Sequence, residues 1–285
     1  MSAHPSTPAN SPATGAVSGP RIRLHHLQAA KNEGRKFAML TAYDTMMAGI
    51  FDAAGIEVLL VGDSAANTVM GYSSTLPITM DEMIVFSKAV VSGAQHALVV
   101  CDLPFGSYEV SPEQAVSSAV RLMKEGGVHA VKLEGGQFFV PHVRALVAAG
   151  VPVMAHIGFT PQSEHALGGY RVQGRGDAAA VLVADAQALE AAGAFAVLME
   201  MIPTGTARQV DEALRVPTVG IGAGAATTGQ VLVWQDMLGL GSGKSARFVK
   251  KYADLRSVVS GAATAYREDV LAGTFPAAEH EFGDR

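Results

Sequence analysis

Acidic and basic residues stand at the ends of several short apolar runs in this sequence. The last residue or two of each run gives Tyr43 and Asp44, Asp63 and Ser64, Asp102, Lys132 with Glu134, His156, and Glu200. A single aspartate in such a place typically caps a helix or meets solvent. The same polar position on six runs indicates a shared site instead, provided that the fold gathers the ends of the runs together.

Three of these residues could hold a cation. Asp63, Asp102 and Glu134 would place three carboxylates in a small volume, which is unfavourable without positive charge. Their oxygens are hard ligands and no cysteine takes part, so Mg²⁺ is favoured over zinc or copper. Lys132 and Glu134 are two residues apart, so on a strand their side chains point to the same side. A local salt bridge between these two would give the same pattern.

Glu200 lies in an almost wholly apolar segment, residues 197–203. Loss of water contact raises the pKa of a carboxyl group and suits it to proton abstraction near neutral pH. The alternative is a carboxylate tied to a basic partner. His156 follows three apolar residues and is open to three interpretations: a metal ligand, a donor to a substrate, or a core histidine.

The elements that must position these residues alternate regularly from Arg21 onward. Short runs rich in Val, Ile and Leu are predicted strands, and Ala-rich stretches such as Pro112–Glu125 and Asp177–Ala192 are predicted helices. Eight strands interleaved with helices either close into a barrel or form an open doubly wound sheet. The polar strand ends favour a single (β/α)8 TIM barrel over residues 21–285. The predicted strands are Phe37–Thr41, Val58–Gly62, Leu98–Asp102, Ala130–Leu133, Val153–His156, Ala196–Glu200, Thr218–Ile221 and Val231–Trp234.

Composition narrows the class of protein. Hydrophobic residues make up 49% of the 285 and charged residues only 16%, as expected for parallel strands buried on both faces. The net charge of −5 favours neither nucleic acid nor an anionic membrane. The single cysteine, Cys101, excludes an intrachain disulfide and a multi-cysteine metal site, and is typical of a reducing compartment. Residues 1–20 are rich in Pro, Ser and Ala and are predicted to be a disordered tail.

Two glycine-rich segments resemble nucleotide-binding loops without matching them. Gly239–Ser245 is one residue too short for a phosphate loop. Gly220–Gly224 lacks the third spaced glycine of a dinucleotide site and suits a loop whose backbone approaches a ligand. ATP and dinucleotide cofactors are therefore not expected.

Longer segments resemble the ketopantoate hydroxymethyltransferase (3-methyl-2-oxobutanoate hydroxymethyltransferase) family. The resemblance extends from Arg21 to Phe282, and its two most specific parts are Val131–Gly136 and Gly168–Arg175. One departure is Gln235, where the family has histidine, in a loop that would line the folate site. The other matching segments are Thr41–Asp44, Val61–Ser64, Ser74–Pro77, Asp102–Phe105, His156–Gln162, Glu200 with Pro203, and Gly220–Gly224.

The resemblance implies a role for each site residue. It implies Mg²⁺ held by Asp63, Asp102 and Glu134, directly or through water, with Glu200 as the catalytic base. It also implies contacts to a 2-oxo acid substrate from Asp63, Ser64, Asp102 and Lys132. Members of the family are cytoplasmic homo-oligomers, commonly decamers.

The implied reaction belongs to pantothenate and coenzyme A biosynthesis. A hydroxymethyl group passes from 5,10-methylenetetrahydrofolate to 3-methyl-2-oxobutanoate through a Mg²⁺-stabilised enolate, giving ketopantoate. Two alternatives stay open. One is another Mg²⁺-dependent barrel enzyme that forms a 2-oxo acid enolate, such as a lyase or mutase, and the other is a non-catalytic barrel scaffold.

Overall fold

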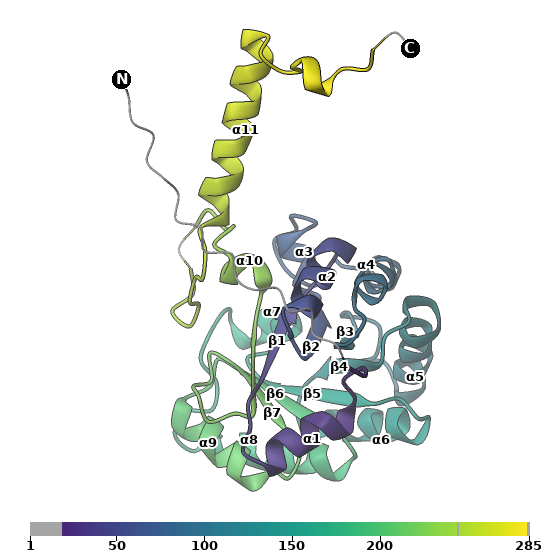
Figure 1. Cartoon of the computed structure of the whole chain (residues 1–285). Coiled ribbons are helices and arrows are strands. Elements are labelled where there is room, and N and C mark those ends of the chain that lie inside the picture. Colours follow the sequence, from purple (N-terminus) through teal and green to yellow (C-terminus); the bar gives the residue numbers. More distant parts are fainter. Residues whose placement is uncertain (1–18, 244, 284–285) are drawn as a thin grey trace.

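The computed structural model describes residues 19–243 and 245–283. Its parallel strands close into a barrel in which β1 pairs with both β2 and β8, and helices surround it (Figure 1). This confirms the predicted (β/α)8 barrel; residues 1–18 of the predicted tail lie outside the described residues. The strands are β1 (Phe37–Thr41), β2 (Val58–Val61), β3 (Leu98–Asp102), β4 (Ala130–Glu134), β5 (Val153–Gly158), β6 (Ala196–Glu200), β7 (Thr218–Ile221) and β8 (Gly229–Leu232).

Four predicted strands have the observed bounds and three differ by one or two residues, but the last prediction is wrong by two residues at both ends. Strand β8 begins at Gly229, and Trp234 already belongs to a helix. Gly229 pairs with Phe37, and a Cβ at Gly229 would stand only 2.5 Å from the Phe37 ring. The strand thus starts with a glycine and a glutamine, which carry no apolar signal.

The helices lie outside the strands and begin at the expected signals. The Ser111 hydroxyl accepts a hydrogen bond from the N–H of Gln114 at 3.2 Å, with Pro112 in the first turn. The predicted helix Pro112–Glu125 divides into α5 (Pro112–Arg121) and a π-helical turn, η1 (Leu122–Gly126). The other elements are α1 (Leu24–Asn32), α2 (Thr45–Ala53), α3 (Ala65–Thr68), α4 (Met80–Gly93), η2 (Gln137–Phe139), α6 (Val140–Ala148), η3 (Pro161–Ser163), α7 (Glu164–Leu167), α8 (Ala178–Ala191), α9 (Thr204–Ala213), α10 (Trp234–Met237), α11 (Leu255–Ala272) and η4 (Ala278–His280).

The core has an inner and an outer layer. Alternate strand residues such as Met39, Leu60 and Met154 fill the inside of the barrel, and Leu27 and Ala30 of α1 close its amino-terminal end. The remaining strand residues pack outward against the surrounding helices. The interior is therefore apolar up to the carboxyl-terminal ends of the strands.

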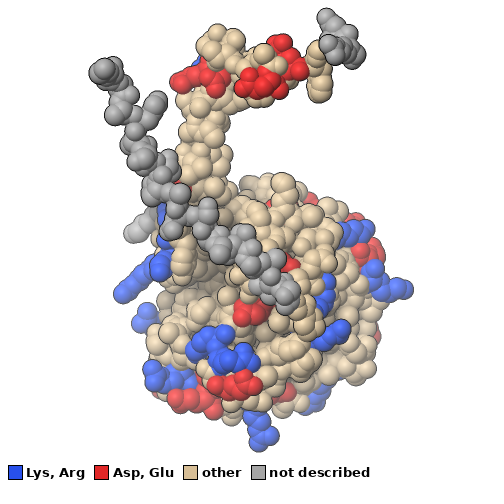
Figure 2. Space-filling model, viewed as in Figure 1, with Lys and Arg blue, Asp and Glu red and all other residues tan. Residues whose placement is uncertain are grey.

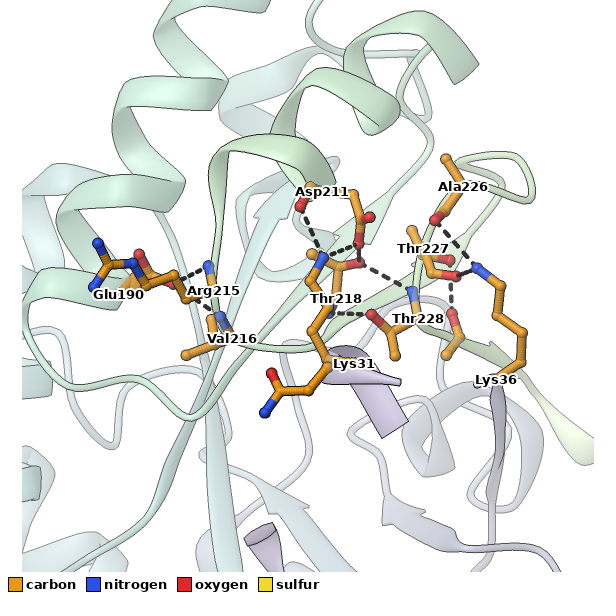
Figure 3. A network of polar contacts seen from close by, with 12 residues as sticks. Lys31, Lys36, Glu190, Asp211, Arg215, Val216, Thr218, Ala226, Thr227 and Thr228 are labelled. Carbon is orange, nitrogen blue, oxygen red and sulfur yellow. Dashed lines mark hydrogen bonds and ion pairs between the residues drawn. The ribbon is translucent and has the colours of Figure 1, made fainter. Parts of the chain in front are cut away.

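Polar contacts hold the amino-terminal end of β7 and the segment before β8 (Figure 3). The Lys31 ammonium of α1 lies 2.8 Å from Asp211 Oδ1, and the Thr218 hydroxyl donates to the same carboxylate. The N–H of Thr228 donates to Thr218 Oγ1 at 3.2 Å. Because Thr218 is the first residue of β7, this network serves the fold and lies at the opposite end of that strand from the polar strand ends.

Helix α11 extends away from the barrel (Figures 1 and 2). None of its residues is buried, and Val258, Tyr266 and Leu271 each expose more than half of their surface, at 65%, 59% and 69%. An apolar groove of about 290 Å³ over β1 and β8 also stays uncovered, lined in part by Leu40 and Leu232. None of the helices in the described part of the chain has the length and apolarity needed to cross a membrane.

Candidate active site

A cavity of about 1160 Å³ lies at the carboxyl-terminal end of the barrel. Most of the residues selected from the sequence line it, although they come from five different strands or the turns after them. Tyr43 and Asp44 do not line it. The selected residues that do are Asp63, Ser64, Asp102, Lys132, Glu134, His156 and Glu200.

The alternation of each strand explains this convergence. Residues two apart on a strand point to the same side, and on four strands the inward-facing row runs from apolar to polar residues. On β4 it runs from Ala130 to Lys132 and Glu134, and on β6 from Leu198 to Glu200. The same step is seen from Val100 to Asp102 on β3 and from Met154 to His156 on β5.

Three buried carboxylates surround one ammonium. Lys132 Nζ lies 2.9 Å from Asp102 Oδ1 and 3.8 Å from Glu134 Oε1, and the N–H of Asp63 donates to Asp102 Oδ2 at 3.0 Å. Burial and the charges of Asp102 and Glu134 raise the pKa of Asp63 well above its ordinary value. Burial also raises the pKa of Asp102, although Lys132 opposes this. The site therefore carries more negative charge than Lys132 alone can neutralise.

The environment of Glu134 favours its ionised form. Burial works against the charge, but the contact with His156, the Lys132 ammonium and the N–H of Gln162 together hold the pKa of Glu134 below its ordinary value. Burial works against the charge of Lys132 too, yet the surrounding carboxylates raise its pKa. The predicted ion pair between Lys132 and Glu134 is thus part of a buried cluster and not a surface salt bridge.

The donor set fits a hydrated divalent cation. Glu134 Oε1 is buried and accepts no hydrogen bond, and Asp102 Oδ1 has only its ion pair with Lys132. Among the described residues, no three Asp, Glu, His or Cys side chains converge closely enough to bind a metal ion directly. Mg²⁺ commonly uses one or two carboxylates and completes its shell with water and substrate oxygens. The arrangement therefore suits partly water-mediated binding better than a closed protein cage.

His156 lies between this cluster and Glu200. Its Nδ1 is 3.2 Å from Lys132 Nζ and 3.3 Å from Glu134 Oε1, and its Nε2 is 3.6 Å from Glu200 Oε2. Burial and the Lys132 charge lower the pKa of His156, so the ring is neutral at neutral pH. A neutral imidazole in the cavity wall is more than a core histidine, and its Nδ1 either accepts from Lys132 or donates to Glu134, according to its tautomer.

Glu200 has the environment of a general base. Burial, followed by the charge of Glu134, raises its pKa to about 8. Within the described residues it makes no ion pair with Lys or Arg, which argues against the alternative of a carboxylate tied to a basic partner. The adjoining backbone is specialised: Gly158 has φ +95°, and a Cβ there would lie 2.4 Å from the Glu200 carbonyl oxygen. Met201, which follows Glu200, has φ 47°, a strained conformation for a side-chain-bearing residue.

The other selected residues divide between site and scaffold. Ser64 lines the cavity, and its hydroxyl lies 2.8 Å from that of buried Tyr43. Burial raises the pKa of Tyr43 to about 12, so its hydroxyl stays neutral. Asp44 is exposed and caps α2 by accepting from the N–H of Met47 at 2.8 Å. Cys101 is fully buried in the core.

Several residues in or beside the cavity were not predicted from the strand ends, because they lie outside the strands. Gln162 in η3 donates to Asp63 Oδ2 at 2.8 Å, and the segment His156–Gln162 was the only sequence signal for it. The cavity is also lined by Arg175, Asp236 and Arg247. Gln235, the departure from the family pattern, is buried next to Asp236 but does not line the cavity. From the segment Gly220–Gly224, Gly222 and Gly224 do line it.

The sequence profile of the family described as ketopantoate hydroxymethyltransferase matches residues 21–278. The chain belongs to this family. Two relatives named 3-methyl-2-oxobutanoate hydroxymethyltransferase are similar to it over nearly their whole length. The protein from Arthrobacter sp. (strain FB24) is 64% identical over 279 residues, covering 96% of this chain and 93% of the relative. That from Paenarthrobacter aurescens (strain TC1) is 66% identical over 262 residues, covering 92% and 87%.

Membership of the ketopantoate hydroxymethyltransferase family confirms the resemblance seen in the sequence and the prediction of a transferase. Solved structures of proteins with little sequence identity to this chain have the same barrel fold. A 2,3-dimethylmalate lyase of the PEP mutase/isocitrate lyase superfamily aligns with a TM-score of 0.58 over 92% of both chains, at 18% identity. Identity this low shows the fold alone, so the lyase or mutase alternative shares the barrel and not the family.

Proposed function

We propose that this protein transfers a hydroxymethyl group from 5,10-methylenetetrahydrofolate to 3-methyl-2-oxobutanoate, giving ketopantoate for pantothenate and coenzyme A biosynthesis. The observation that carries the proposal is a base of raised pKa, Glu200, in the same cavity as the Lys132 cluster. Such a pair can remove a proton beside a ketone and stabilise the resulting negative charge. Family membership selects this substrate from the other 2-oxo acids.

The residues of the cluster would bind the substrate and the cation. Asp63, Asp102 and Glu134 would hold Mg²⁺, at least in part through water, and when bound it would supply positive charge to the keto and carboxylate oxygens of the substrate. Lys132 adds a second positive charge on the same side, while Ser64 offers a hydroxyl and Asp63 and Asp102 orient the substrate through the cation. The substrate's reacting carbon would then face Glu200 across the cavity.

Glu200 would remove the proton from carbon 3 of the substrate. Lys132, held by its ion pair with Asp102, stabilises the enolate oxygen. Carbon 3 then forms a bond to the methylene carbon delivered by folate. The two carbon–nitrogen bonds of that methylene break, and water supplies the hydroxyl oxygen of the product. The folate nitrogens take up the proton held by Glu200 and one proton of the water, so tetrahydrofolate leaves. The neutral ring of His156 separates the protonated Lys132 from Glu200, so the base is not tied up in a direct ion pair.

Deuterium exchange tests the first step directly. The protein is incubated with Mg²⁺ and 3-methyl-2-oxobutanoate in deuterated water, and loss of the carbon 3 proton is followed by NMR. We expect exchange without folate, and ketopantoate only when the folate donor is added. Absence of exchange would contradict the assignment, whereas exchange with no folate-dependent product would favour a lyase or mutase. A non-catalytic scaffold gives neither signal.

The proposal includes a cytoplasmic homo-oligomer, with ten copies expected from the family. Support comes from two uncovered apolar surfaces, helix α11 and the groove over β1 and β8. A helix from one copy packed over the groove of another would bury both, with a gain of roughly 25 cal/mol per Å² of apolar area.

Light scattering coupled to gel filtration measures the assembly. Deletion of residues 255–285 is expected to lower the mass to that of smaller species, and an unchanged number of subunits would contradict this role of α11.

A further inference from the structure

Gln162 contacts two of the three carboxylates at once. Its side-chain Nε2 donates to Asp63 Oδ2 at 2.8 Å and to the carbonyl oxygen of Leu103 at 3.0 Å. Its backbone N–H donates to Glu134 Oε2 at 3.0 Å. Only 6% of the residue is exposed, so water competes little for these hydrogen bonds. One residue therefore fixes the position of Asp63 relative to Glu134.

Tyr108 fixes the orientation of the Gln162 amide. The Tyr108 hydroxyl donates to Gln162 Oε1 at 2.6 Å and accepts from the N–H of Glu134 at 3.2 Å. With Oε1 engaged by this donor, the amide must turn its Nε2 toward Asp63. Burial and the nearby charge of Glu134 raise the pKa of Tyr108, so the hydroxyl keeps the proton that it donates.

The hydrogen bonds engage one oxygen of each carboxylate. Asp63 Oδ2 accepts from Gln162, Glu134 Oε2 accepts from the Gln162 N–H, and Asp102 Oδ2 accepts from the Asp63 N–H. The second oxygens of Asp102 and Glu134 are buried beside other ionisable groups: Asp102 Oδ1 pairs with Lys132, and Glu134 Oε1 lies 3.3 Å from His156 Nδ1 and 3.8 Å from Lys132 Nζ. In Asp63 and Glu134, the oxygen that Gln162 does not hold is thus the one that can face a cation.

We propose that Gln162 and Tyr108 are positioning residues that orient the free oxygens of Asp63 and Glu134 toward the divalent cation. This inference rests on the proposed function, because it concerns the same metal site. Gln162 is chemically suited to the task, since an amide holds a carboxylate without adding negative charge to a cluster that already has an excess. Residues that orient metal ligands typically change metal affinity about 10- to 100-fold when they are replaced.

Metal titration of the full-length protein without substrate tests the proposal. Mg²⁺ binding is measured by calorimetry and Mn²⁺ binding by the loss of the free-ion electron paramagnetic resonance signal. Gln162→Met removes the amide at similar volume, and Tyr108→Phe removes only the hydroxyl and keeps the ring packed against Phe139. We expect about 10- to 100-fold weaker binding in both variants. Excess Mg²⁺ should restore deuterium exchange in both variants. A general folding defect, by contrast, would leave exchange low at any Mg²⁺ concentration.

Thr218→Val is the matched control. It also removes a buried hydroxyl that makes hydrogen bonds, but at the amino-terminal end of the barrel (Figure 3). Its metal affinity should equal that of the wild type. If the wild type binds Mg²⁺ and both test variants bind it equally well, the positioning role is refuted while the metal site stands. If the wild type does not bind Mg²⁺, the metal part of the proposed function fails and this inference fails with it. Should Gln162→Met not fold, Tyr108→Phe decides the question alone.

Discussion

Replacement of Glu200 by glutamine tests two properties of this residue, its role as the base and its raised pKa. Glutamine keeps the size and polarity of the side chain but cannot accept the substrate proton. Loss of a general base typically lowers the rate about 10²- to 10⁴-fold, so the deuterium exchange rate of E200Q should fall by this factor. The variant should still fold, because Glu200 makes no ion pair with Lys or Arg in the described part of the chain.

The same substitution should change the pH dependence of stability. The pKa of Glu200 rises from an ordinary 4.5 to about 8, so between these values the folded protein keeps a proton that the unfolded chain has lost. The unfolded state then binds fewer protons, and the free energy of unfolding falls as pH rises. The slope approaches about 1.4 kcal/mol per pH unit, which amounts to about 2 to 3 kcal/mol from about pH 5 to about pH 7. Glutamine does not titrate, so E200Q should gain this much relative to the wild type over that interval.

Urea unfolding at the two pH values measures this difference, with a chelator present so that metal binding does not contribute. Glu212→Gln, at an exposed position on α9, is the matched control and should change neither the exchange rate nor the pH dependence. An exchange rate within a few-fold of the wild type would refute the role of Glu200 as base. A stability difference that is independent of pH would refute its raised pKa, whatever the rate.

Three other changes probe the cation cluster and the scaffold. Asp102→Asn should raise the Mg²⁺ concentration needed for half-maximal exchange by about 10-fold or more, because it removes a charged ligand; an unchanged requirement would show that Asp102 does not hold the metal. Gly158→Ala should cost more than about 1 kcal/mol in urea unfolding and slow exchange, since its Cβ would collide with the Glu200 carbonyl, whereas Gly205→Ala, with open space around it, should do neither. Ser111→Ala should cost about 1 kcal/mol through the lost cap of α5 and leave the exchange rate unchanged, as thermal unfolding and NMR would show.

The sequence predicted the barrel because parallel strands buried on both faces leave a strong apolar signal. That signal fails at β8, which begins with Gly229 and Gln230, since the strand there depends on the absence of a side chain beside Phe37. Helical periodicity likewise does not distinguish the π-helical turn Leu122–Gly126 from a continued α-helix. At β8 a contact between distant segments decides the local structure, and the local sequence pattern does not include that contact.

The members of the site on strands were predictable, and the members in loops were not. Strand alternation brings Asp102, Lys132 and Glu200 inward as soon as the barrel closes. Gln162 and Tyr108 reach the carboxylates from segments after β5 and β3, where no periodicity constrains the direction of a side chain. Asp44 shows the opposite case: it follows a strand like the others, yet it turns away to cap a helix.

The burial of the cluster explains why its acidic residues divide into two roles. Lys132 and the Gln162 N–H stand beside Glu134, so the pKa of this carboxyl stays low in spite of burial. Glu200 is less enclosed than Glu134, with 15% of its side chain exposed against 3%, but it has only the neutral ring of His156 nearby at 3.6 Å, and burial raises its pKa to about 8. A carboxylate that must hold a cation needs its charge, whereas one that must take a proton needs affinity for it. Lys132 lies on the far side of His156 from Glu200. This one ammonium therefore keeps the pKa of Glu134 low and leaves the pKa of Glu200 raised.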